Sequence, residues 1–396
     1  MPSIRISTTA RRGVAAAAAA AAVLGGSVAL ASPAAAAPSL LNVIVTLEPS
    51  ADPAATSTSL LGRGNVSHVF SHALNGFAGT LSSALLTTLR GDARVKSIEI
   101  DRGVRATATQ APTPSWGLDR TDQRSLPLNS SYTYNSTGSG VTAYIIDTGI
   151  TLGHPDFGGR AVSGYDAVDG GSADDCNGHG THVAGTVGGS AFGIAKSARL
   201  VAVRVLGCDG SGTNAGVIAG IDWAVANHAA GTPAVANFSL GGAASSAVDS
   251  AINRLIADGV TVAVAAGNEN ADACGGSPSR VPGALTVGAS DRNDRRASFS
   301  NVGNCVDLFA PGVDITSDWL NNGTNTISGT SMATPHVAGV AAQYLQANPS
   351  ASPAAVSSAI LGATTKDKIS DTAGGCQLLI VCTPATPNND LLYSTF

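Results

Sequence analysis

Residues 141–149 read Val-Thr-Ala-Tyr-Ile-Ile-Asp-Thr-Gly, an apolar run that ends at Asp147. Such a run, closed by a polar residue and a glycine, is typical of a strand that is buried on both faces. Further short apolar runs bounded by Gly, Asn or Asp lie at 200–206, 234–240, 260–266 and 284–287, with helical candidates between them at 180–187, 215–227 and 246–258. Strands that alternate with helices predict an α/β fold, with a mostly parallel sheet flanked by helices on both faces.

Two polar residues directly follow predicted strands, namely Asp147 and Asn268. In parallel sheets the functional groups gather at the carboxyl ends of the strands. The placement of these two side chains therefore favours a functional role for both. For Asn268 alone, the alternative is an ordinary turn asparagine.

The composition fits a globular enzyme. Of the 396 residues, 44% are hydrophobic and 12% are charged, which is enough apolar material for a sizeable core in one large or two smaller domains. The formal net charge of -5 gives no sign of a basic surface, so nucleic acid is not an expected partner.

The N-terminus, residues 1–37, has the pattern of a secretory signal peptide. Three arginines precede an alanine-rich apolar run at 14–30, and the small residues at 34–37 fit a cleavage site. A membrane-spanning helix is the alternative, but the run is short and broken by glycines. We expect a secreted, extracellular protein without a membrane anchor; the general and the twin-arginine export routes both stay open.

Residues 38–107 form a distinct segment without cysteine. Alternating apolar residues at 41–47 and 95–104 predict strands, and leucines at positions 81, 85, 86 and 89 follow a helical spacing. The segment is thus expected to be a small α+β domain, and it carries no catalytic constellation. The polar stretch 106–115 that follows is expected to be an exposed connection.

All six cysteines lie between Cys176 and Cys382. An even number of cysteines in an exported chain implies disulfide bonds, and the spacing alone does not choose among the 15 pairings that six cysteines allow. Because no two cysteines form a C-x-x-C pair, a zinc site is not expected.

Three segments supply an Asp, a His and a Ser in that chain order. They are Ile145-Ile146-Asp147-Thr148-Gly149, Asn177-Gly178-His179-Gly180-Thr181-His182-Val183-Ala184-Gly185 and Gly329-Thr330-Ser331-Met332-Ala333-Thr334-Pro335-His336-Val337-Ala338-Gly339. A serine hydroxyl becomes a useful nucleophile when an imidazole takes its proton and a buried carboxylate orients that imidazole. Asp147, His179 and Ser331 are therefore candidates for a catalytic triad.

Each of these residues also has a structural interpretation. Asp147 alone could cap a turn, His179 could be a buried histidine, and Ser331 could be a helix N-cap with Pro335 in the first turns. Agreement of all three segments by chance is far less probable than any one of these. The remaining histidines of the motifs, at positions 182 and 336, are better candidates for structural roles.

The chain order Asp…His…Ser and the residues around each member resemble the subtilisin family, in its proteinase K and aqualysin branch; α/β-hydrolases and chymotrypsin-type enzymes use other orders. Residues 38–107 resemble the inhibitor-type propeptide of that family, most clearly at Asn75-Gly76-Phe77-Ala78. The resemblance implies a subtilisin-like peptidase domain at 108–396 that follows an inhibitor-like propeptide.

The resemblance also implies roles for individual residues. The Asn268 side chain and the Ser331 backbone N–H would stabilise the oxyanion. An extended peptide would lie along Gly210, Ser211 and Gly212, and the walls of the primary specificity pocket would be Ser239, Leu240, Gly241, Gly242, Ala265, Ala266 and Gly267. These walls carry no charge, which predicts broad specificity with a preference for apolar or small residues before the scissile bond.

Structural calcium, without a catalytic metal, is implied at two places, since oxygen ligands suit this ion. One site would use the carbonyls of Pro282 and Ala284 with the carboxylate of Asp307, and the other would use Asp119, Asp122 and Gln123. Asn129 stands where some relatives have a further carboxylate. The alternative for both clusters is solvated surface acids.

The disulfides that the resemblance implies are Cys176–Cys208 and Cys274–Cys305, which leaves Cys376–Cys382 to close a short loop. A bridge three residues before His179 would also brace the catalytic loop.

The whole pattern predicts a secreted, monomeric serine endopeptidase. Its own propeptide would serve as chaperone and inhibitor until self-cleavage near Thr107–Ala108. Three other interpretations are a catalytically inactive binding protein, a lipase or esterase with the same triad, and a wall-associated structural protein. The intact triad argues against the first, the chain order and propeptide against the second, and the lack of a visible anchor against the third. The physiological substrate, the exact cleavage sites, the number of calcium ions and the thermal stability do not follow from the sequence.

Overall fold

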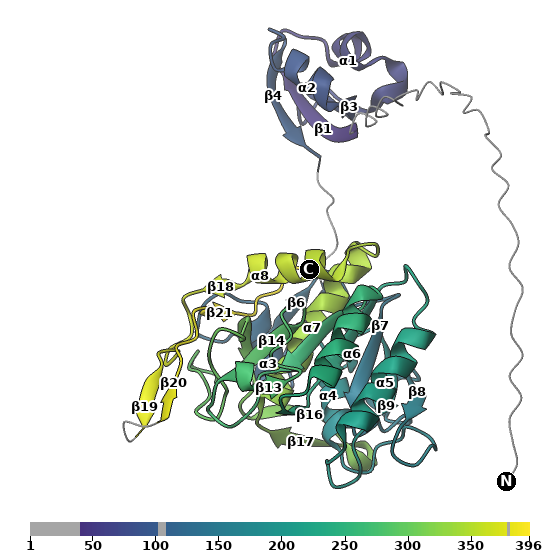
Figure 1. Ribbon diagram of the computed structural model, residues 1–396. Helices are drawn as coiled ribbons and strands as arrows, with labels where there is room; N and C mark the ends of the chain where they lie inside the picture. The colour runs from purple at the N-terminus through teal and green to yellow at the C-terminus, as the bar shows by residue number, and fades with distance from the viewer. Residues whose placement is uncertain (1–39, 102–107, 378–380) are drawn as a thin grey trace, which may run out of the picture. The chain divides into compact units, whose positions relative to one another are not determined.

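The computed structural model describes residues 40–101, 108–377 and 381–396, except for the side chains of 375–377, 381 and 382 (Figure 1). The chain divides into two compact units, Met1–Val104 and Arg105–Phe396. The predicted signal peptide, residues 1–37, lies outside the described residues. In the described part of the chain, no helix has the length and apolar character to cross a bilayer.

The first unit is an antiparallel sheet with two helices. Its strands run in the order β2 (Val66–Phe70), β3 (Gly76–Ser82), β1 (Leu40–Leu47) and β4 (Val95–Ile100), and its helices are α1 (Pro53–Leu61) and α2 (Ser83–Leu89). The predicted strand at 41–47 and the small α+β architecture are confirmed. Leu81 lies in β3 instead of the predicted helix, because Ser82 caps α2 by accepting from the Leu85 N–H.

The second unit is built on one nine-stranded sheet. From edge to edge its strands are β18 (Thr365–Lys366), β21 (Asp390–Leu391), β15 (Leu308–Pro311), β14 (Leu285–Ser290), β12 (Thr261–Ala265), β10 (Ala234–Phe238), β7 (Thr142–Asp147), β9 (Arg199–Arg204) and β8 (Ala161–Asp166). All neighbours pair in parallel except β18 and β21. The predicted, mostly parallel sheet is therefore confirmed.

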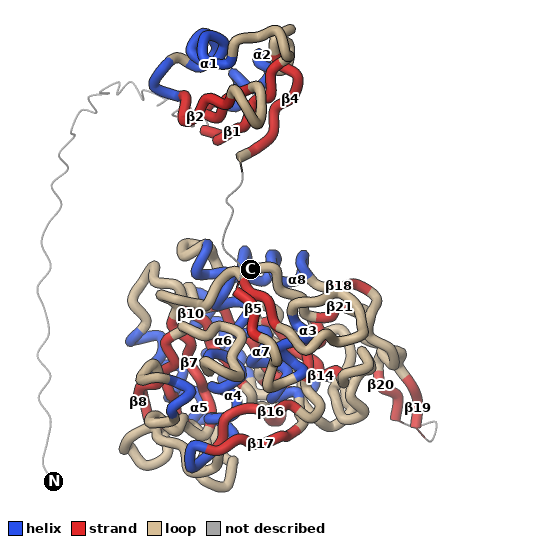
Figure 2. The backbone as a smooth tube through the Cα atoms, turned by 180° about the vertical axis from the view of Figure 1, so that it is seen from behind, coloured by secondary structure: helices blue, strands red, loops and turns tan. Residues whose placement is uncertain are grey.

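Helices cover both faces of this sheet (Figures 1 and 2). They are α3 (Trp116–Thr121), α4 (His179–Gly188), α5 (Asn214–Asn227), α6 (Ser246–Ala257), α7 (Thr330–Ala347) and α8 (Pro353–Ala363). Successive residues of β7 point to opposite faces: Ala143 and Ile145 join the core with α4 and α7, while Tyr144 and Ile146 join the core with α5 and α6. Because both faces of β7 are buried, its sequence is apolar throughout.

The strand order reverses between β7 and β10. The chain runs from β7 outward to β8 and β9, and then returns to place β10 on the other side of β7. Ligand sites of open α/β sheets lie outside the carboxyl ends of the strands at such a switch point. Asp147 ends β7, and Ser239 and Asn268 follow β10 and β12 closely, so this edge of the sheet brings the candidate residues together.

Part of the stretch predicted to be an exposed connection is ordered. Ala108–Gln110 forms strand β5, which pairs with β6 (Tyr132–Tyr134), and the two threonine hydroxyls of Thr109 and Thr133 lie 3.1 Å apart across the pair. The polar composition gave no sign of this strand, because a separate two-stranded sheet that is exposed on one side needs no apolar residues there.

Candidate active site

Asp147 presents a buried carboxylate at the end of β7. Its side chain has no exposed surface, and its Oδ1 accepts hydrogen bonds from the Thr148 N–H at 2.8 Å and from His179 Nδ1 at 2.7 Å. The bond to Nδ1 fixes the imidazole with its other nitrogen, Nε2, directed away from the carboxylate. This is the pair that a histidine base requires.

His179 is the first residue of α4, and the turn before it is organised by Asp175. The Asp175 Oδ1 accepts from the N–H groups of Asn177 and Gly178 at 2.9 and 3.0 Å, and its Oδ2 accepts from the Thr181 N–H and hydroxyl. Gly178 has a φ of 105°, a backbone conformation that favours glycine. Asp175 thus replaces the absent N-cap side chain and fixes the start of the helix.

The surroundings of His179 set its protonation. Burial by itself would lower the pKa of the imidazole, but the charge and hydrogen bond of Asp147, with a contribution from Asp175, outweigh it and raise the pKa above the ordinary 6.5. The ring keeps 25% of its surface exposed, so substrate and solvent can reach it.

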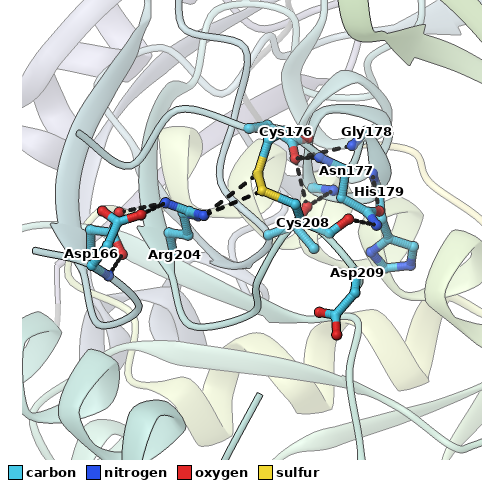
Figure 3. The surroundings of a disulfide bond; sticks show 12 residues. Asp166, Cys176, Asn177, Gly178, His179, Arg204, Cys208 and Asp209 are labelled. Atoms are coloured by element: carbon cyan, nitrogen blue, oxygen red, sulfur yellow. Dashed lines mark hydrogen bonds and ion pairs between the residues drawn. A yellow bond between two sulfur atoms is a disulfide. The ribbon is translucent and has the colours of Figure 1, made fainter. Parts of the chain in front are cut away.

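A disulfide links the turn before His179 to a neighbouring segment (Figure 3). Cys176 and Cys208 are bonded, and Asn177 adds a second link, because its Nδ2 donates to the Cys208 carbonyl at 2.9 Å and its Oδ1 accepts from the His179 N–H at 3.2 Å. Arg204 lies against both sulfurs and pairs with Asp166 at 2.8 Å. The histidine loop is therefore braced on the segment that leads into Gly210–Gly212.

Ser331 is the second residue of α7, whose N-cap is Gly329. Its Oγ donates to the Ser239 carbonyl at 3.0 Å, and its own carbonyl accepts from the Ser239 Oγ at 2.7 Å. Pro335, four residues on, has no N–H for that carbonyl, and Ser239 supplies the missing donor. The Ser331 N–H belongs to the first helical turn, where N–H groups lack an intrahelical acceptor and favour negative charge.

Asn268 lies beside the start of α7. Its Oδ1 accepts from the Thr330 N–H at 2.9 Å and from the Thr330 hydroxyl at 3.0 Å. These two contacts fix the orientation of the amide, so that the Nδ2 atom is the group left to donate toward the cavity that Asn268 and Ser331 both line.

Two cavities adjoin along Leu240–Gly242. One, of about 470 Å³, is lined by Ser331, Asn268 and the predicted pocket walls Ala265–Gly267. The other, of about 630 Å³, is lined by His179, Ser239 and the predicted edge segment Gly210–Gly212. The predicted catalytic, oxyanion and substrate-binding residues other than Asp147 thus line a groove made of two cavities that share Leu240–Gly242, with His179 in one and Ser331 in the other.

The lining of the first cavity includes charged residues. Besides the predicted walls, Glu269 and Asp272 line it, together with the polar side chains of Ser279 and Asn301. Sequence reasoning missed these residues because Asn301 is distant in the chain and the two acids follow the strand end within an ordinary turn sequence. The expected preference for apolar or small residues before the scissile bond therefore takes account of only part of the pocket lining.

His182 and His336 are fully buried. His182 Nε2 bonds to the Ile315 carbonyl at 3.0 Å and His336 Nδ1 bonds to the Met332 carbonyl at 2.9 Å. Burial lowers the pKa of each imidazole to about 4, so both are neutral packing groups, as their positions in the motifs predict.

The residues predicted to hold calcium occupy two separate places. Asp119 is buried and accepts from the N–H groups of Asn129 and Ser130, while Asp122 accepts from the Thr133 N–H at 2.7 Å. Gln123 instead donates through Nε2 to the Ser125 and Pro127 carbonyls.

The other predicted calcium set contains a single acid. Asp307 Oδ2 accepts from the Thr286 N–H at 2.8 Å; in the same predicted set, Pro282 is exposed and Ala284 is buried. Among the described residues, no group of three or more His, Cys, Asp or Glu side chains is arranged to hold a metal ion, so calcium at these places would need backbone or amide oxygens as well.

Two predicted disulfides are confirmed, Cys176–Cys208 with 5.0 Å between the Cα atoms and Cys274–Cys305 with 5.3 Å. Strands β19 (Gly375–Gln377) and β20 (Val381–Thr383) pair with Cys376 opposite Cys382. The side chains of these two cysteines lie outside the described residues, so the third bridge stays a prediction.

Comparisons with known proteins agree with this geometry. Residues 138–376 match the family described as the subtilase family, and residues 42–107 match peptidase inhibitor I9. An extracellular serine proteinase of Thermus sp. (strain Rt41A) is 56% identical over 322 residues, covering 81% of this chain and 78% of that protein.

Two further relatives extend the comparison. An alkaline serine exoprotease A of Vibrio alginolyticus is 55% identical and covers 80% of this chain, which spans 60% of that longer protein. The crystal structure of a cold adapted subtilisin-like serine proteinase matches with a TM-score of 0.67 and 53% identity, over 72% of this chain and all of the other.

Proposed function

Because the chain belongs to the subtilase family and is a serine endopeptidase with an inhibitor-type N-terminal domain, we propose that Asp147, His179 and Ser331 are its catalytic triad. The observation that carries the proposal is the 2.7 Å bond between a fully buried Asp147 carboxylate and His179 Nδ1, at the strand-order switch point of the sheet. Ser331 lines the other side of the same groove.

In this mechanism Ser331 Oγ attacks the peptide carbonyl carbon and His179 Nε2 takes the hydroxyl proton. The hydroxyl turns from its bond with the Ser239 carbonyl toward the imidazole when substrate binds, since catalytic hydrogen bonds commonly tighten only in the substrate complex. Asp147 holds the imidazole tautomer and stabilises the imidazolium. The proton then passes from His179 to the leaving amine, and water hydrolyses the acyl-enzyme by the same steps.

The oxyanion of the tetrahedral intermediate is stabilised by two donors. One is Asn268 Nδ2, whose partner oxygen is held by Thr330, and the other is the Ser331 N–H in the first turn of α7. Preorganised donors of this kind need no reorientation as charge develops, which is why they act on the rate of the chemical step.

Substrate would lie as an extended peptide along Gly210–Gly212, with the residue before the scissile bond in the pocket walled by Ser239–Gly242 and Ala265–Gly267. Backbone pairing gives broad specificity, because it does not depend on side chains. The small walls favour apolar or small residues, and the two carboxylates of the pocket add tolerance of basic ones.

The N-terminal domain, proposed to span 38–107, would serve as chaperone and inhibitor of the peptidase domain at 108–396. Self-cleavage near Thr107–Ala108 would release it. The new N-terminus would then begin in β5, which pairs with β6 and so anchors the mature chain. Export through the signal peptide at 1–37 agrees with the extracellular relative from Thermus.

Structural calcium fits the acidic residues in part. Asp122 Oδ1 is buried and has no partner among the described residues, and its pKa is raised to about 6, first by burial and then by the neighbouring Asp119. Burial also raises the pKa of Asp307 to about 6. A cation bound at each place would compensate these partly buried carboxylates and stabilise the fold. It would be held by Asp119, Asp122 and Gln123 at one place and by Pro282, Ala284 and Asp307 at the other.

The proposal is tested by expressing the precursor and its Ser331→Ala variant side by side in a host without secreted proteases. The wild type is expected to lose residues before about Ala108 and to hydrolyse casein, and the variant to keep its N-terminal domain and leave casein intact. Equal processing of the two would overturn self-cleavage. Hydrolysis of a long-chain ester in preference to casein would favour a lipase.

A further inference from the structure

Asn301 is a buried asparagine that lies outside the three catalytic segments, with 7% of its surface exposed. All four hydrogen bonds of its side chain go to the loop Ala266–Ala271, which carries Asn268. Its Oδ1 accepts from the N–H groups of Glu269 and Ala271 at 3.0 and 2.9 Å. Its Nδ2 donates to the Ala266 carbonyl and to Glu269 Oε2, both at 2.9 Å.

The backbone of Asn301 adds a fifth contact, because its N–H donates to the Gly267 carbonyl at 3.0 Å. The fit between the two segments is close. Gly267 has a φ of 103°, and a Cβ placed on it would come within 2.3 Å of Asn301 Nδ2. The glycine of the Gly267-Asn268 pair is thus required both by its backbone conformation and by the asparagine packed against it.

These contacts hold the residues on both sides of Asn268, while the side chain of Asn268 itself is held by Thr330. Two acceptors of the loop and two of its donors are matched by one amide, a pattern that only Asn or Gln can supply. A smaller side chain at position 301 would leave the N–H groups of Glu269 and Ala271 without a partner, and the loop would have to move to satisfy them.

We propose that Asn301 is a positioning residue for catalysis, which fixes the loop Ala266–Ala271 so that Asn268 Nδ2 points at the developing oxyanion. This inference rests on the oxyanion role given to Asn268 in the proposed function. Asn301 also holds the pocket walls Ala266 and Gly267, but none of its hydrogen bonds reaches the walls Ser239–Gly242. Its loss is therefore expected to act on turnover mainly through Asn268.

A double-mutant cycle separates positioning from simple stabilisation. Wild type, N301A, N268A and N301A/N268A are compared as active-site-titrated mature enzymes on a peptide anilide with an uncharged residue before the scissile bond. N301A is expected to lower kcat about 10- to 100-fold with KM changed less than about threefold, within the loss of about 10²–10³ expected for N268A. When N301A is added to the N268A variant, kcat should fall by less than about a further threefold.

Asn389 supplies a matched control, because its side chain makes the same kind of contacts outside the loop Ala266–Ala271, accepting from the Ile369 N–H and donating to the Ile369 carbonyl, both at 2.7 Å. N389A should lower the melting temperature without lowering kcat. N301D keeps the volume of the side chain and both acceptor contacts but faces the Glu269 carboxylate; adding E269Q restores a donor there and should recover part of kcat, which gives a second readout if N301A does not fold.

The outcomes are distinct. A loss of kcat by N301A that is the same with and without Asn268 would overturn positioning through Asn268, as would a lowered melting temperature with unchanged kcat. If N268A instead keeps the wild-type kcat, Asn268 does not have the oxyanion role given in the proposed function. Asn301 then cannot act on turnover through Asn268.

Discussion

The Asp147 carboxylate and the His179 imidazole share a 2.7 Å hydrogen bond in which the carboxylate is completely buried and the ring is a quarter exposed. The carboxylate is therefore placed to orient the ring, and the ring to reach substrate. Burying an anion costs stability unless hydrogen bonds or opposite charge compensate it, and here the Thr148 N–H and His179 Nδ1 are the partners.

Asp147→Asn tests this relationship. The amide keeps the shape of the carboxylate but stabilises the wrong imidazole tautomer, so kcat should fall by about 10⁴, as it does in other serine peptidases with this triad. Steady-state hydrolysis of a peptide substrate measures it. Asp258→Asn is the matched control, because Asp258 pairs with His228 at 2.8 Å away from the groove and should leave kcat within about twofold. A similar loss in both variants would speak against a specific role for Asp147.

The pH dependence of kcat/KM follows from the raised pKa of His179. The imidazole acts as base only when neutral, and its pKa lies above 6.5 in the folded enzyme. Activity should therefore rise with a midpoint above pH 6.5 and persist into alkali, measured with an uncharged peptide substrate. Faster cleavage at pH 5 than at pH 8 would be incompatible with this assignment.

Glu269 should affect which residue the enzyme accepts before the scissile bond. Its carboxylate lines the primary pocket and is held by Asn301, so it should favour a lysine before the scissile bond. Glu269→Gln is expected to lower the ratio of kcat/KM for a lysine substrate to that for a phenylalanine substrate about threefold to tenfold. A ratio that does not change would show that the pocket reads size alone, as the walls predicted from the sequence suggest.

The buried Asp318 should make the free energy of unfolding depend on pH, independently of catalysis. Its side chain is fully buried, 3.6 Å from His154 Nδ1, and burial together with the neighbouring Asp156 raises its pKa to about 8, against an opposing effect of Arg160. Between the unfolded value of 3.8 and about 8, the folded protein holds a proton that the unfolded chain has lost. The free energy of unfolding should thus fall as pH rises, by at most about 1.4 kcal/mol per pH unit from this group.

Asp318→Asn should flatten that dependence. Urea unfolding of the serine-inhibited enzyme at pH 5, 6.5 and 8, at constant saturating calcium, compares the two proteins. The variant is expected to gain stability relative to the wild type as pH increases. Parallel curves for the two proteins would mean that Asp318 does not hold its proton in the folded state.

The sheet could be predicted from sequence because β7, β10 and β12 are buried on both faces and so appear as uninterrupted apolar runs. The triad segments could be found because each candidate residue lies at the end of a strand or the start of a helix that its own segment forms. Asp175 carried a usable signal as well, since Asp-Asp-Cys-Asn-Gly before His179 is typical of side-chain-capped turns.

Other features depend on contacts that the sequence does not display. The bond between Ser239 and the carbonyl freed by Pro335 joins segments 92 residues apart, and Asn301 reaches its loop from 30 to 35 residues away. Strand β5 is polar and gains its order from pairing with β6 rather than from burial. Such long-range polar contacts follow from the fold and not from any local pattern.

The most direct measurement is covalent labelling of the mature enzyme with a fluorophosphonate, followed by peptide mapping by mass spectrometry. The account predicts a single adduct on Ser331, with loss of casein hydrolysis in proportion to labelling, and no adduct in the His179→Ala variant once wild-type enzyme has removed its N-terminal domain. An adduct on another residue, or undiminished casein hydrolysis after complete modification of Ser331, would contradict it.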